Sequence, residues 1–258
     1  MSDESRPSPA ADAAGTAAGA RTAAVIPAAG RGVRLGPGAP KALRTLGGTP
    51  MLVHAVRAMA ASRLVSLVVV VAPPDGATEV KALIDAHALP ERTDVLVVPG
   101  GESRQESVRL GLDALPPEYD TVLVHDAARP LVPVDTVDTV VEAVRGRAPA
   151  VVPALPLADT VKEVGPPAAP GGVEPVVATP ERARLRAVQT PQGFEREVLV
   201  RAHATVTENV TDDASMVEQL GLPVVAVPGH EEAFKVTRPL DLVLAEAVLA
   251  RRRLNDGF

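Results

Sequence analysis

A short segment that is apolar on both faces constrains the fold of this 258-residue chain more than any other feature. Residues 64–72 contain one polar side chain, Ser66, among valines, leucines and an alanine. An extended segment of this kind must be buried on both faces, which is typical of parallel sheets that helices cover on each side. It is also far shorter than the roughly 20 apolar residues of a spanning helix, so we expect no membrane segment.

Similar strand patterns alternate with helical patterns along the chain. Strands are expected at 23–27, 64–72, 94–98, 121–125, 150–153 and 223–227. Helices are expected from Thr49-Pro50, at about 78–88, after Ser103, from Asp135 to about Arg145, near 195–205, from Thr211 to about 220, and from Pro239 to about Arg252. Thr49, Asp135 and Thr211 are the expected capping residues, and Ser103 with Glu106 has capping-box spacing. This alternation predicts βαβ units, and therefore an α/β fold with a mainly parallel, Rossmann-like doubly wound sheet.

Two stretches interrupt the alternation. Residues 1–21 are rich in Ala, Ser, Pro and Gly without apolar periodicity, so we expect a disordered tail followed by a single domain over 22–258. Residues 154–188 are rich in Pro and Gly between short Val-rich pieces, which predicts a protruding β-arm. A long excursion from a compact domain is usually functional or a contact with a partner.

Composition excludes several kinds of chemistry. The absence of Cys excludes disulfides, thiolate zinc sites and Cys nucleophiles. The five His are scattered without zinc-site spacing, and a Gly-x-Ser-x-Gly nucleophile motif is absent. A net charge of −6 and four aromatic residues argue against a nucleic-acid partner. The charged N-terminus has no apolar signal-peptide region, so we expect a cytoplasmic protein.

A glycine-rich loop follows the first expected strand, at the sheet edge where α/β proteins place ligands. It contains Pro27, Ala28, Ala29, Gly30 and Gly32, and two cations, Arg34 and Lys41, stand beyond it. The dinucleotide fingerprint fails because Leu35 occupies its third glycine position, and Lys41-Ala42 is not the Gly-Lys-Ser/Thr of a P-loop. The remaining arrangement suits a triphosphate whose α-phosphorus is attacked, because charge accumulates on the phosphoryl oxygens. A tight turn with solvated charges is the alternative interpretation.

Asp126 and Arg129 follow the fourth expected strand and would lie at the same edge. Asp126 could hold Mg²⁺ or another divalent cation, since such ions prefer carboxylate and phosphate oxygens. Arg129 could clamp a phosphate through two hydrogen bonds. A salt bridge between the two residues within a turn is an equally good interpretation of this segment alone.

Three further segments carry candidate binding residues. Gly101 and Ser107 could line a base pocket, although a capping box already explains Ser103 and Glu106. Lys235 precedes the last helix and could reach phosphates, or could simply begin that helix. On or near the arm, hydroxyl groups and an arginine could bind a phosphate held by a neighbouring subunit, or could be solvated: Thr160, Arg182 and Thr190.

Taken in order, these segments resemble the 2-C-methyl-D-erythritol 4-phosphate cytidylyltransferase family. The motifs are Pro-Ala-Ala-Gly-x-Gly-x-Arg, Pro-Lys, Gly-Gly-x-x-Arg-x-x-Ser, His-Asp-Ala-Ala-Arg-Pro, Asp-Thr-x-Lys, Thr-Pro-Gln, Thr-Asp-Asp-Ala and Lys-Val-Thr-Arg-Pro. Each motif alone is weak, but all eight in order are highly specific, and the resemblance runs from about Ala23 to Leu249. Ala42, Glu102 and Leu240 depart from it, where Gln, Asp and Glu are common.

The resemblance implies an activity, a fold and a set of site residues. It implies transfer of CMP from CTP to 2-C-methyl-D-erythritol 4-phosphate with Mg²⁺, on a nucleotide-diphospho-sugar transferase fold, by a homodimer with interlocked arms. Arg34 and Lys41 would stabilise the triphosphate. The cytidine would be held by Ala28, Ala29, Gly30, Gly101, Glu102, Ser107 and Ala127. The polyol phosphate or the metal would be held by Asp126, Arg129, Thr211 and Lys235. Thr160, Arg182 and Thr190 would approach from the second subunit.

Two other functions stay open on the sequence alone. A cytidylyltransferase for another polyol phosphate, such as ribitol 5-phosphate, would use the same CTP-binding segments. A nucleotide-binding regulator would keep the fold without the chemistry, but it should have lost some of the charged residues, and Arg34, Lys41, Asp126 and Lys235 are all present.

Overall fold

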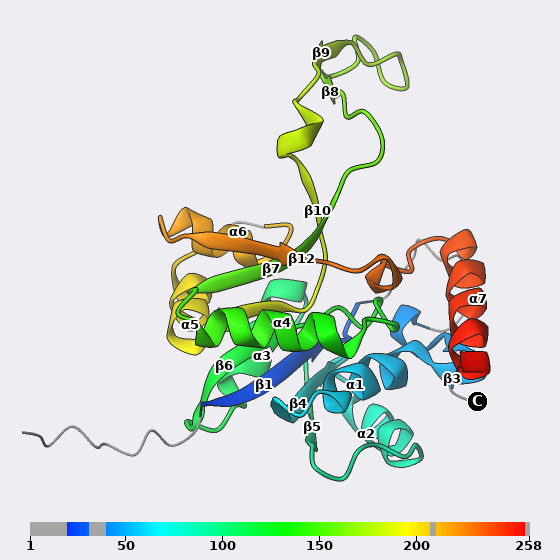
Figure 1. The fold of residues 1–258 in the computed structure, drawn as a ribbon, viewed down its shortest axis with the longest axis vertical. Coiled ribbons are helices and arrows are strands. Elements are labelled where there is room, and N and C mark those ends of the chain that lie inside the picture. The colour runs from blue at the N-terminus through cyan, green and yellow to red at the C-terminus, as the bar shows by residue number, and fades with distance from the viewer. Residues whose placement is uncertain (1–19, 31–39, 207–209, 256–258) are drawn as a thin grey trace, which may run out of the picture.

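The central element of the computed structural model is a mostly parallel sheet, as expected (Figure 1). The structure describes residues 20–30, 40–206 and 210–255, apart from the side chain of Lys41. The sheet contains β5 (Asp94–Pro99), β4 (Val65–Ala72), β1 (Arg21–Pro27), β6 (Tyr119–Val124), β11 (Gln192–Glu195) and β7 (Ala150–Pro156) in that order, while β10 (Arg186–Val188) and β12 (Val224–Pro228) also pair with β7. The strand order reverses at β1, so β1 and β6 flank the switch point where α/β sheets bind ligands.

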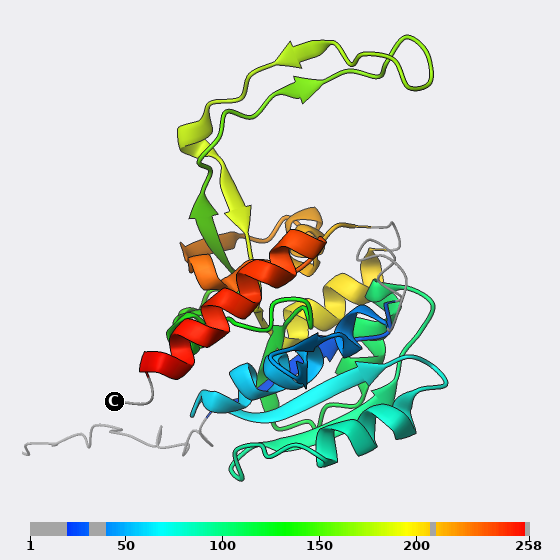
Figure 2. The same cartoon turned by 90° about the vertical axis from the view of Figure 1, so that its right-hand side faces the viewer.

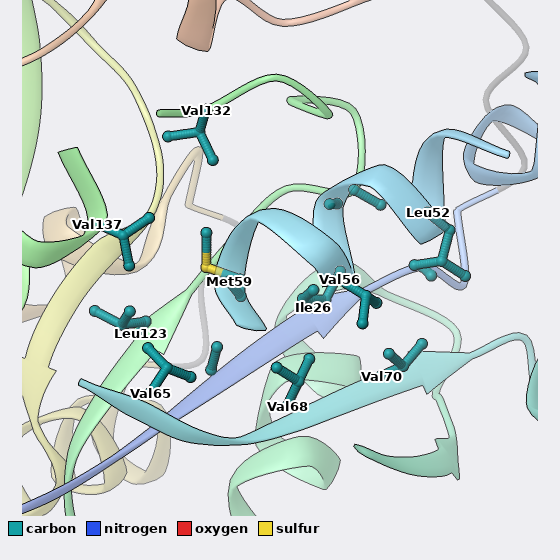
Figure 3. Packing of buried hydrophobic residues seen from close by; sticks show 14 of the residues in the cluster. Ile26, Leu52, Val56, Met59, Val65, Val68, Val70, Leu123, Val132 and Val137 are labelled. Carbon is teal, nitrogen blue, oxygen red and sulfur yellow. The ribbon is translucent and has the colours of Figure 1, made fainter. Parts of the chain in front are cut away.

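Helices cover both faces of the sheet because its strands are buried on both faces. On β1, Ala24 and Ile26 point to one face, and Ala23 and Val25 point to the other. The first face packs against α1 (Met51–Ala61), α2 (Ala77–Asp85) and α4 (Val134–Arg145), and Figure 3 shows Leu52, Val56 and Met59 of α1 over this layer. The second face packs against α3 (Arg104–Asp113), α5 (Arg196–Thr205) and α6 (Asp213–Gln219). The doubly wound arrangement is therefore confirmed.

A third, smaller apolar cluster holds the last helix beside the sheet. Helix α7 (Pro239–Asn255) packs on the short hairpin of β2 (Thr45–Leu46) and β3 (Thr49–Pro50) and on the start of α1, in a cluster that contains Leu46, Met51 and Ala245. Val236, just ahead of α7, is fully buried in this cluster and donates its N–H to the carbonyl of Ala128 at 2.8 Å. The segment that carries Lys235 is therefore fixed against the loop that follows β6.

The predicted β-arm protrudes from the sheet, and Figure 2 shows it curving away from the body. Its two strands are β8 (Glu163–Val164) and β9 (Val176–Ala178), and η3 (Arg182–Arg184) leads back to the body. The arm is shorter than the predicted 154–188, because residues 154–156 belong to β7 and residues 186–188 to β10, which pair within the central sheet.

Other boundaries also differ from the sequence predictions. Arg21 is part of β1 rather than the tail, because it pairs with Glu118 at 3.2 Å and stacks over the ring of Tyr119; residues 1–19 lie outside the described residues. The predicted caps at Thr49, Asp135 and Thr211 are wrong, since Pro50, Pro133 and Asp212 hold those positions. Strand β11 was not predicted, because four residues that include a glycine carry little strand pattern.

Across the described residues, the longest helices are too short or too polar to cross a membrane.

Candidate active site

A cavity of about 270 Å³ opens at the carboxyl edge of the sheet, beside the switch point. The loops that follow β1, β5 and β6 and the segment before α7 form its wall, so the structure brings together segments that are far apart in the sequence. The lining residues are Pro27, Ala28, Ala29, Gly30, Ala42, Gly101, Glu102, Ser103, Arg104, Ser107, Asp126, Ala127, Ala128 and Lys235.

The loop after β1 forms one side of the cavity. The Ala28 N–H donates to the carbonyl of Val71 on β4 at 2.8 Å, which fixes the start of the loop against the neighbouring strand. Gly32 and Arg34 lie outside the described residues. Lys41 begins the short helix η2 (Lys41–Leu43), and its side chain is also outside the described part of the chain.

The loop between β5 and α3 forms the opposite side, and its local hydrogen bonds explain its shape. The Ser103 hydroxyl accepts from the Glu106 N–H at 3.0 Å, as the capping-box spacing predicted. The Glu106 carboxylate accepts from the N–H of Glu102 at 2.8 Å, one residue ahead of the cap. Ser107 accepts from the N–H of Gly101 at 3.2 Å, so Gly101 and Ser107 are held together in the cavity wall.

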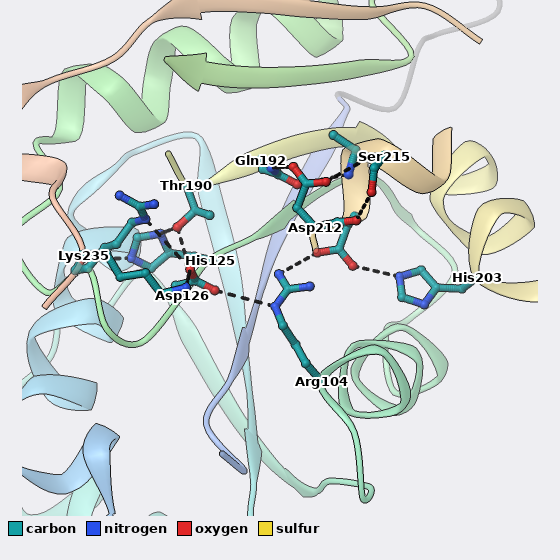
Figure 4. A network of polar contacts seen from close by, with 12 residues as sticks. Arg104, His125, Asp126, Thr190, Gln192, His203, Asp212, Ser215 and Lys235 are labelled. Carbon is teal, nitrogen blue, oxygen red and sulfur yellow. Dashed lines mark hydrogen bonds and ion pairs between the residues drawn. The ribbon is translucent and has the colours of Figure 1, made fainter. Parts of the chain in front are cut away.

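Asp126 lies among three cationic side chains, as Figure 4 shows for Lys235 and Arg104. Its carboxylate is 2.7 Å from Lys235 Nζ, 3.7 Å from Arg104 Nε and 3.9 Å from Arg129 Nε. Burial alone would raise the pKa of Asp126, but the charges of Lys235 and Arg104 outweigh burial and hold the pKa at about 2. The carboxylate is therefore ionised throughout the neutral pH range.

The buried side chains of His125 and Thr190 fix the backbone of Asp126. Thr190 accepts from the Asp126 N–H at 3.1 Å, and its hydroxyl lies 3.1 Å from His125 Nδ1. His125 Nε2 lies 3.2 Å from the carbonyl of Arg129, so Nε2 carries the proton and Nδ1 accepts from Thr190. Burial lowers the pKa of His125 to about 4, and the ring is neutral. Thr190 is therefore not an arm residue that approaches from a partner, because it is buried and bonded within its own subunit.

Arg129 braces the site instead of facing the cavity. It donates to the carbonyl of Ala233 at 2.7 Å and to the carbonyl of Val188 at 3.2 Å. These bonds join the loop after β6 to the base of the arm and to the segment before Lys235. A phosphate clamp at Arg129 would have to replace them, so that role stays a prediction.

The remaining predicted residues do not line this cavity. Thr160 is exposed on the arm, and Arg182 is exposed in η3, where it donates to the carbonyl of Ala158. Thr211 is exposed ahead of α6. A phosphate contact from Thr160 or Arg182 to such a cavity would have to come from the arm of another subunit.

The donor set fits Mg²⁺ only in a limited way. Among the described residues there is no cluster of three or more His, Asp or Glu side chains suited to a metal. Asp126 could supply one carboxylate oxygen, but Lys235 already occupies the other at 2.7 Å. Mg²⁺ usually keeps several waters and binds one or two carboxylates together with substrate phosphates. Asp126 is therefore a suitable single protein ligand for a metal carried largely by a triphosphate.

Sequence reasoning missed four residues that organise the site. Arg104 stands in the Gly-Gly-x-x-Arg-x-x-Ser motif and lines the cavity, but it was given no role. Gln192 holds the start of α6, since it donates to Asp212 at 2.7 Å and accepts from the Ala214 N–H at 3.2 Å. Asp213 and His203 are buried behind Arg104. Spacing carries no signal for their contacts, which arise only where α3, α5 and α6 meet.

The fold and this cavity define an α/β protein of the nucleotide-diphospho-sugar transferase type. The family model of 2-C-methyl-D-erythritol 4-phosphate cytidylyltransferase (IspD) matches residues 22–251, and the chain belongs to this family. The resemblance found in the motifs is thus confirmed.

Individual relatives agree with this assignment over nearly the whole chain. The chain is 84% identical to the 2-C-methyl-D-erythritol 4-phosphate cytidylyltransferase of Streptomyces avermitilis and 83% identical to that of Streptomyces coelicolor, with 100% of each chain covered. Among solved structures, the Thermus thermophilus cytidylyltransferase is 36% identical with a TM-score of 0.67, over 87% of this chain and 97% of that one. The 4-diphosphocytidyl-2C-methyl-D-erythritol synthase of Anaerococcus prevotii is 25% identical with a TM-score of 0.73, over 90% and 99%.

The lowered pKa of Asp126 predicts a pH-dependent contribution to stability. The pKa of Asp126 falls from an ordinary value of 3.8 to about 2 in the folded protein. Above pH 4 the ionised carboxylate therefore contributes on the order of 2 kcal/mol to the free energy of unfolding, and this contribution is lost as the pH falls towards 2. Asp126→Asn should therefore lower the free energy of unfolding at pH 6, and the difference from wild type should narrow towards pH 2. Urea unfolding across this range measures it.

Asp85→Asn is the matched control, because Asp85 pairs with Lys81 on the exposed surface. Such a pair is worth little, so this variant should unfold almost like wild type at each pH. A constant difference between Asp126→Asn and wild type from pH 6 to pH 2 would contradict the assignment.

Proposed function

We propose that this protein transfers the cytidylyl group of CTP to 2-C-methyl-D-erythritol 4-phosphate and releases pyrophosphate, in the cytoplasm. The observation that carries the proposal is the family match over residues 22–251, together with a cavity lined by the motif residues of that family. The names of the Streptomyces relatives, identical at more than four positions in five, point to the same substrate.

The reaction needs positioning and charge stabilisation. An oxygen of the polyol phosphate attacks the α-phosphorus of CTP in line, a new P–O bond forms, and the bond to the bridging oxygen breaks so that pyrophosphate leaves. No covalent intermediate with the protein is required, which agrees with a chain that has no Cys. Catalysis then depends on holding the two phosphates together and on neutralising the charge that accumulates between them.

The cavity wall supplies groups for each part of the nucleotide. The small residues at the end of β1 and after it (Pro27, Ala28, Ala29 and Gly30) would let the ligand approach the backbone, and Gly101, Glu102, Ser107 and Ala127 form the proposed cytidine pocket. Gly32, the other proposed nucleotide-binding residue of this segment, lies outside the described residues. Arg34 and Lys41 are the proposed partners of the triphosphate. Mg²⁺, held by the phosphates and Asp126, would neutralise part of their charge.

The polyol phosphate is assigned to the Asp126 side of the cavity. The side chain of Lys235 lies at the cavity wall and is 39% exposed, and its ammonium pairs with Asp126 at 2.7 Å. Asp126 thereby holds the ammonium in place while leaving it accessible to an incoming phosphate. Arg129 and Thr211 are the other proposed contacts on this side.

We further propose a homodimer in which the arm of each subunit completes the site of the other. Thr160 and Arg182 would contact the polyol phosphate of the neighbouring subunit. The protruding arm supports this, because it exposes Val173, Val176 and Val177, with Val173 at 91%. Lys162 Nζ and Thr179 Oγ1, 2.7 Å apart, join the two sides of the arm near these residues.

A pyrophosphate-release assay tests the function. CTP, UTP and ATP are each combined with 2-C-methyl-D-erythritol 4-phosphate or ribitol 5-phosphate, with and without Mg²⁺. We expect release only when CTP, the methylerythritol phosphate and the metal are all present. Preference for ribitol 5-phosphate would favour the alternative cytidylyltransferase. CTP binding without turnover on any acceptor would favour a regulator.

Arg34→Ala and Lys41→Ala should each lower kcat by roughly 10²–10³-fold, because each removes a preorganised charge from the triphosphate. The KM for the polyol phosphate should change much less. Steady-state kinetics measures both, with Arg109→Ala and Lys81→Ala as controls, since these cations form exposed pairs on helix surfaces. An unchanged kcat in Arg34→Ala or in Lys41→Ala would refute the role proposed for that residue.

Subunit mixing tests the arm. Lys235→Ala damages the cavity and Arg182→Ala damages the arm, so each pure variant should be nearly inactive. Random mixing should restore about a quarter of wild-type activity, because half of the dimers are mixed and each of those has one intact site. Mixing Lys235→Ala with Lys41→Ala should restore none, because neither of these residues is proposed to act from the arm. Recovery in neither mixture would contradict a shared site.

A further inference from the structure

Asp213 is a charged residue that the proposed reaction does not use, yet it is completely buried. It begins α6, with an exposed fraction of 0%. Burial alone would raise the pKa of Asp213, but a hydrogen bond from His203 and the charge of Arg104 outweigh it and lower the pKa. The protein thus keeps an ionised carboxylate out of water at considerable cost in solvation, which calls for a physical reason.

Capping of α6 does not supply that reason. Asp212 accepts from the Ser215 N–H at 3.0 Å and is the cap of this helix. Pairing does not supply it either, because buried ion pairs seldom stabilise a fold more than apolar residues of the same size. The contacts that Asp213 makes must therefore serve something other than the local stability of α6.

Asp213 connects a buried histidine to the wall of the cavity, and Figure 4 labels the two residues that it joins, His203 and Arg104. One carboxylate oxygen lies 3.0 Å from His203 Nε2, and the other lies 2.7 Å from Arg104 Nη2. Since a carboxylate only accepts, His203 Nε2 carries the donated proton. His203 is on α5, Asp213 on α6 and Arg104 on α3, so the chain joins three helices behind the cavity.

Arg104 contacts the buried Asp213 on one side and lines the cavity on the other. It lines the cavity, its side chain is 35% exposed, and its Nε lies 3.7 Å from Asp126. The described contacts of the guanidinium use Nε and Nη2, and among the described residues none uses Nη1. Around this point ion pairs join three cations to two carboxylates, Asp126 and Asp213, while the carboxylates of Asp212 and Glu102 lie nearby.

We propose that Arg104 is a further ligand-binding residue of this cavity, specific for a phosphate group, and that the buried Asp213, fixed by His203, is its positioning residue. A guanidinium is suited to phosphate because its planar fork can donate two hydrogen bonds. A long arginine side chain loses rotamer freedom on binding, and the contact with Asp213 removes that freedom in advance. For CTP as the ligand, this inference rests on the proposed function.

A double-mutant cycle tests whether Asp213 acts through Arg104. Calorimetry measures the Kd of CTP, and separately of inorganic pyrophosphate, for wild type, Arg104→Gln, Asp213→Asn and the double variant. Each single change should raise Kd roughly tenfold, since a charged hydrogen bond is lost or misplaced. The Kd of the double variant should be no higher than that of the single variant with the higher Kd, because a positioning residue has no effect on binding once Arg104 is gone.

Two further variants separate positioning from simple destabilisation. His203→Gln keeps an N–H donor near the position of Nε2 and should retain near-native Kd, whereas His203→Ala should resemble Asp213→Asn. Ser215→Ala removes the hydrogen bond, 2.8 Å long, from the Ser215 hydroxyl to the carbonyl of the capping residue Asp212, and it should leave Kd unchanged. Thermal unfolding of every variant confirms that binding is measured on folded protein.

The outcomes distinguish this inference from the proposed function. Additive losses in the cycle, or native Kd values in Arg104→Gln, would overturn the inference while leaving the cytidylyltransferase function intact. If pyrophosphate binds with the non-additive Kd changes expected of the cycle and CTP does not bind at all, the inference is supported and the proposed function is contradicted. Absence of binding of both probes to wild type would contradict both.

Discussion

The parallel pairing of β1 with β4 and β6 is the constraint on which the rest of this structure depends. β1 lies inside the sheet and is buried on both faces, so it can only be paired on each side and covered by helices above and below. Parallel strands end at the same edge, and the loops after β1, β5 and β6 therefore converge there. The cavity at this edge is a consequence of the topology, and the residues of the loops decide its chemistry.

Charge at this edge is arranged around two carboxylates with different surroundings. Asp126 is close to the cavity and has three cations about it, which keeps it ionised and keeps Lys235 near the place where a phosphate would bind. Asp213 is fully buried and contacts the back of Arg104. Arg104 thus lies between the two carboxylates. The net charge of −6 gives no indication that three cations gather at this edge.

Much of the fold and part of the site followed from sequence patterns, for reasons that particular segments make clear. Residues 64–72 had to form a buried strand because no other arrangement hides both of their faces, and β4 is found there. Asp126 was expected at the ligand-binding edge because it follows a strand, and it lines the cavity. Gly101 and Ser107, expected to line a base pocket, and Lys235, expected to reach phosphates, line it as well. Strand β11 was not predicted, because four residues that include a glycine carry little strand pattern. The predicted caps of α1, α4 and α6 were each displaced by one or two residues, because neighbouring residues compete for the end of a helix.

The sequence by itself determined the class of sheet, its helical cover and the family of the chain, because these depend on apolar periodicity and on the order of motifs. Only the tertiary structure decided which polar groups touch. It turned Thr190 from an arm residue into a buried support of Asp126, and Arg129 into a brace between loops. It also joined His203, Asp213 and Arg104 from three helices. The physical reason is that burial and charge pairing depend on distances across the fold, which sequence spacing does not record.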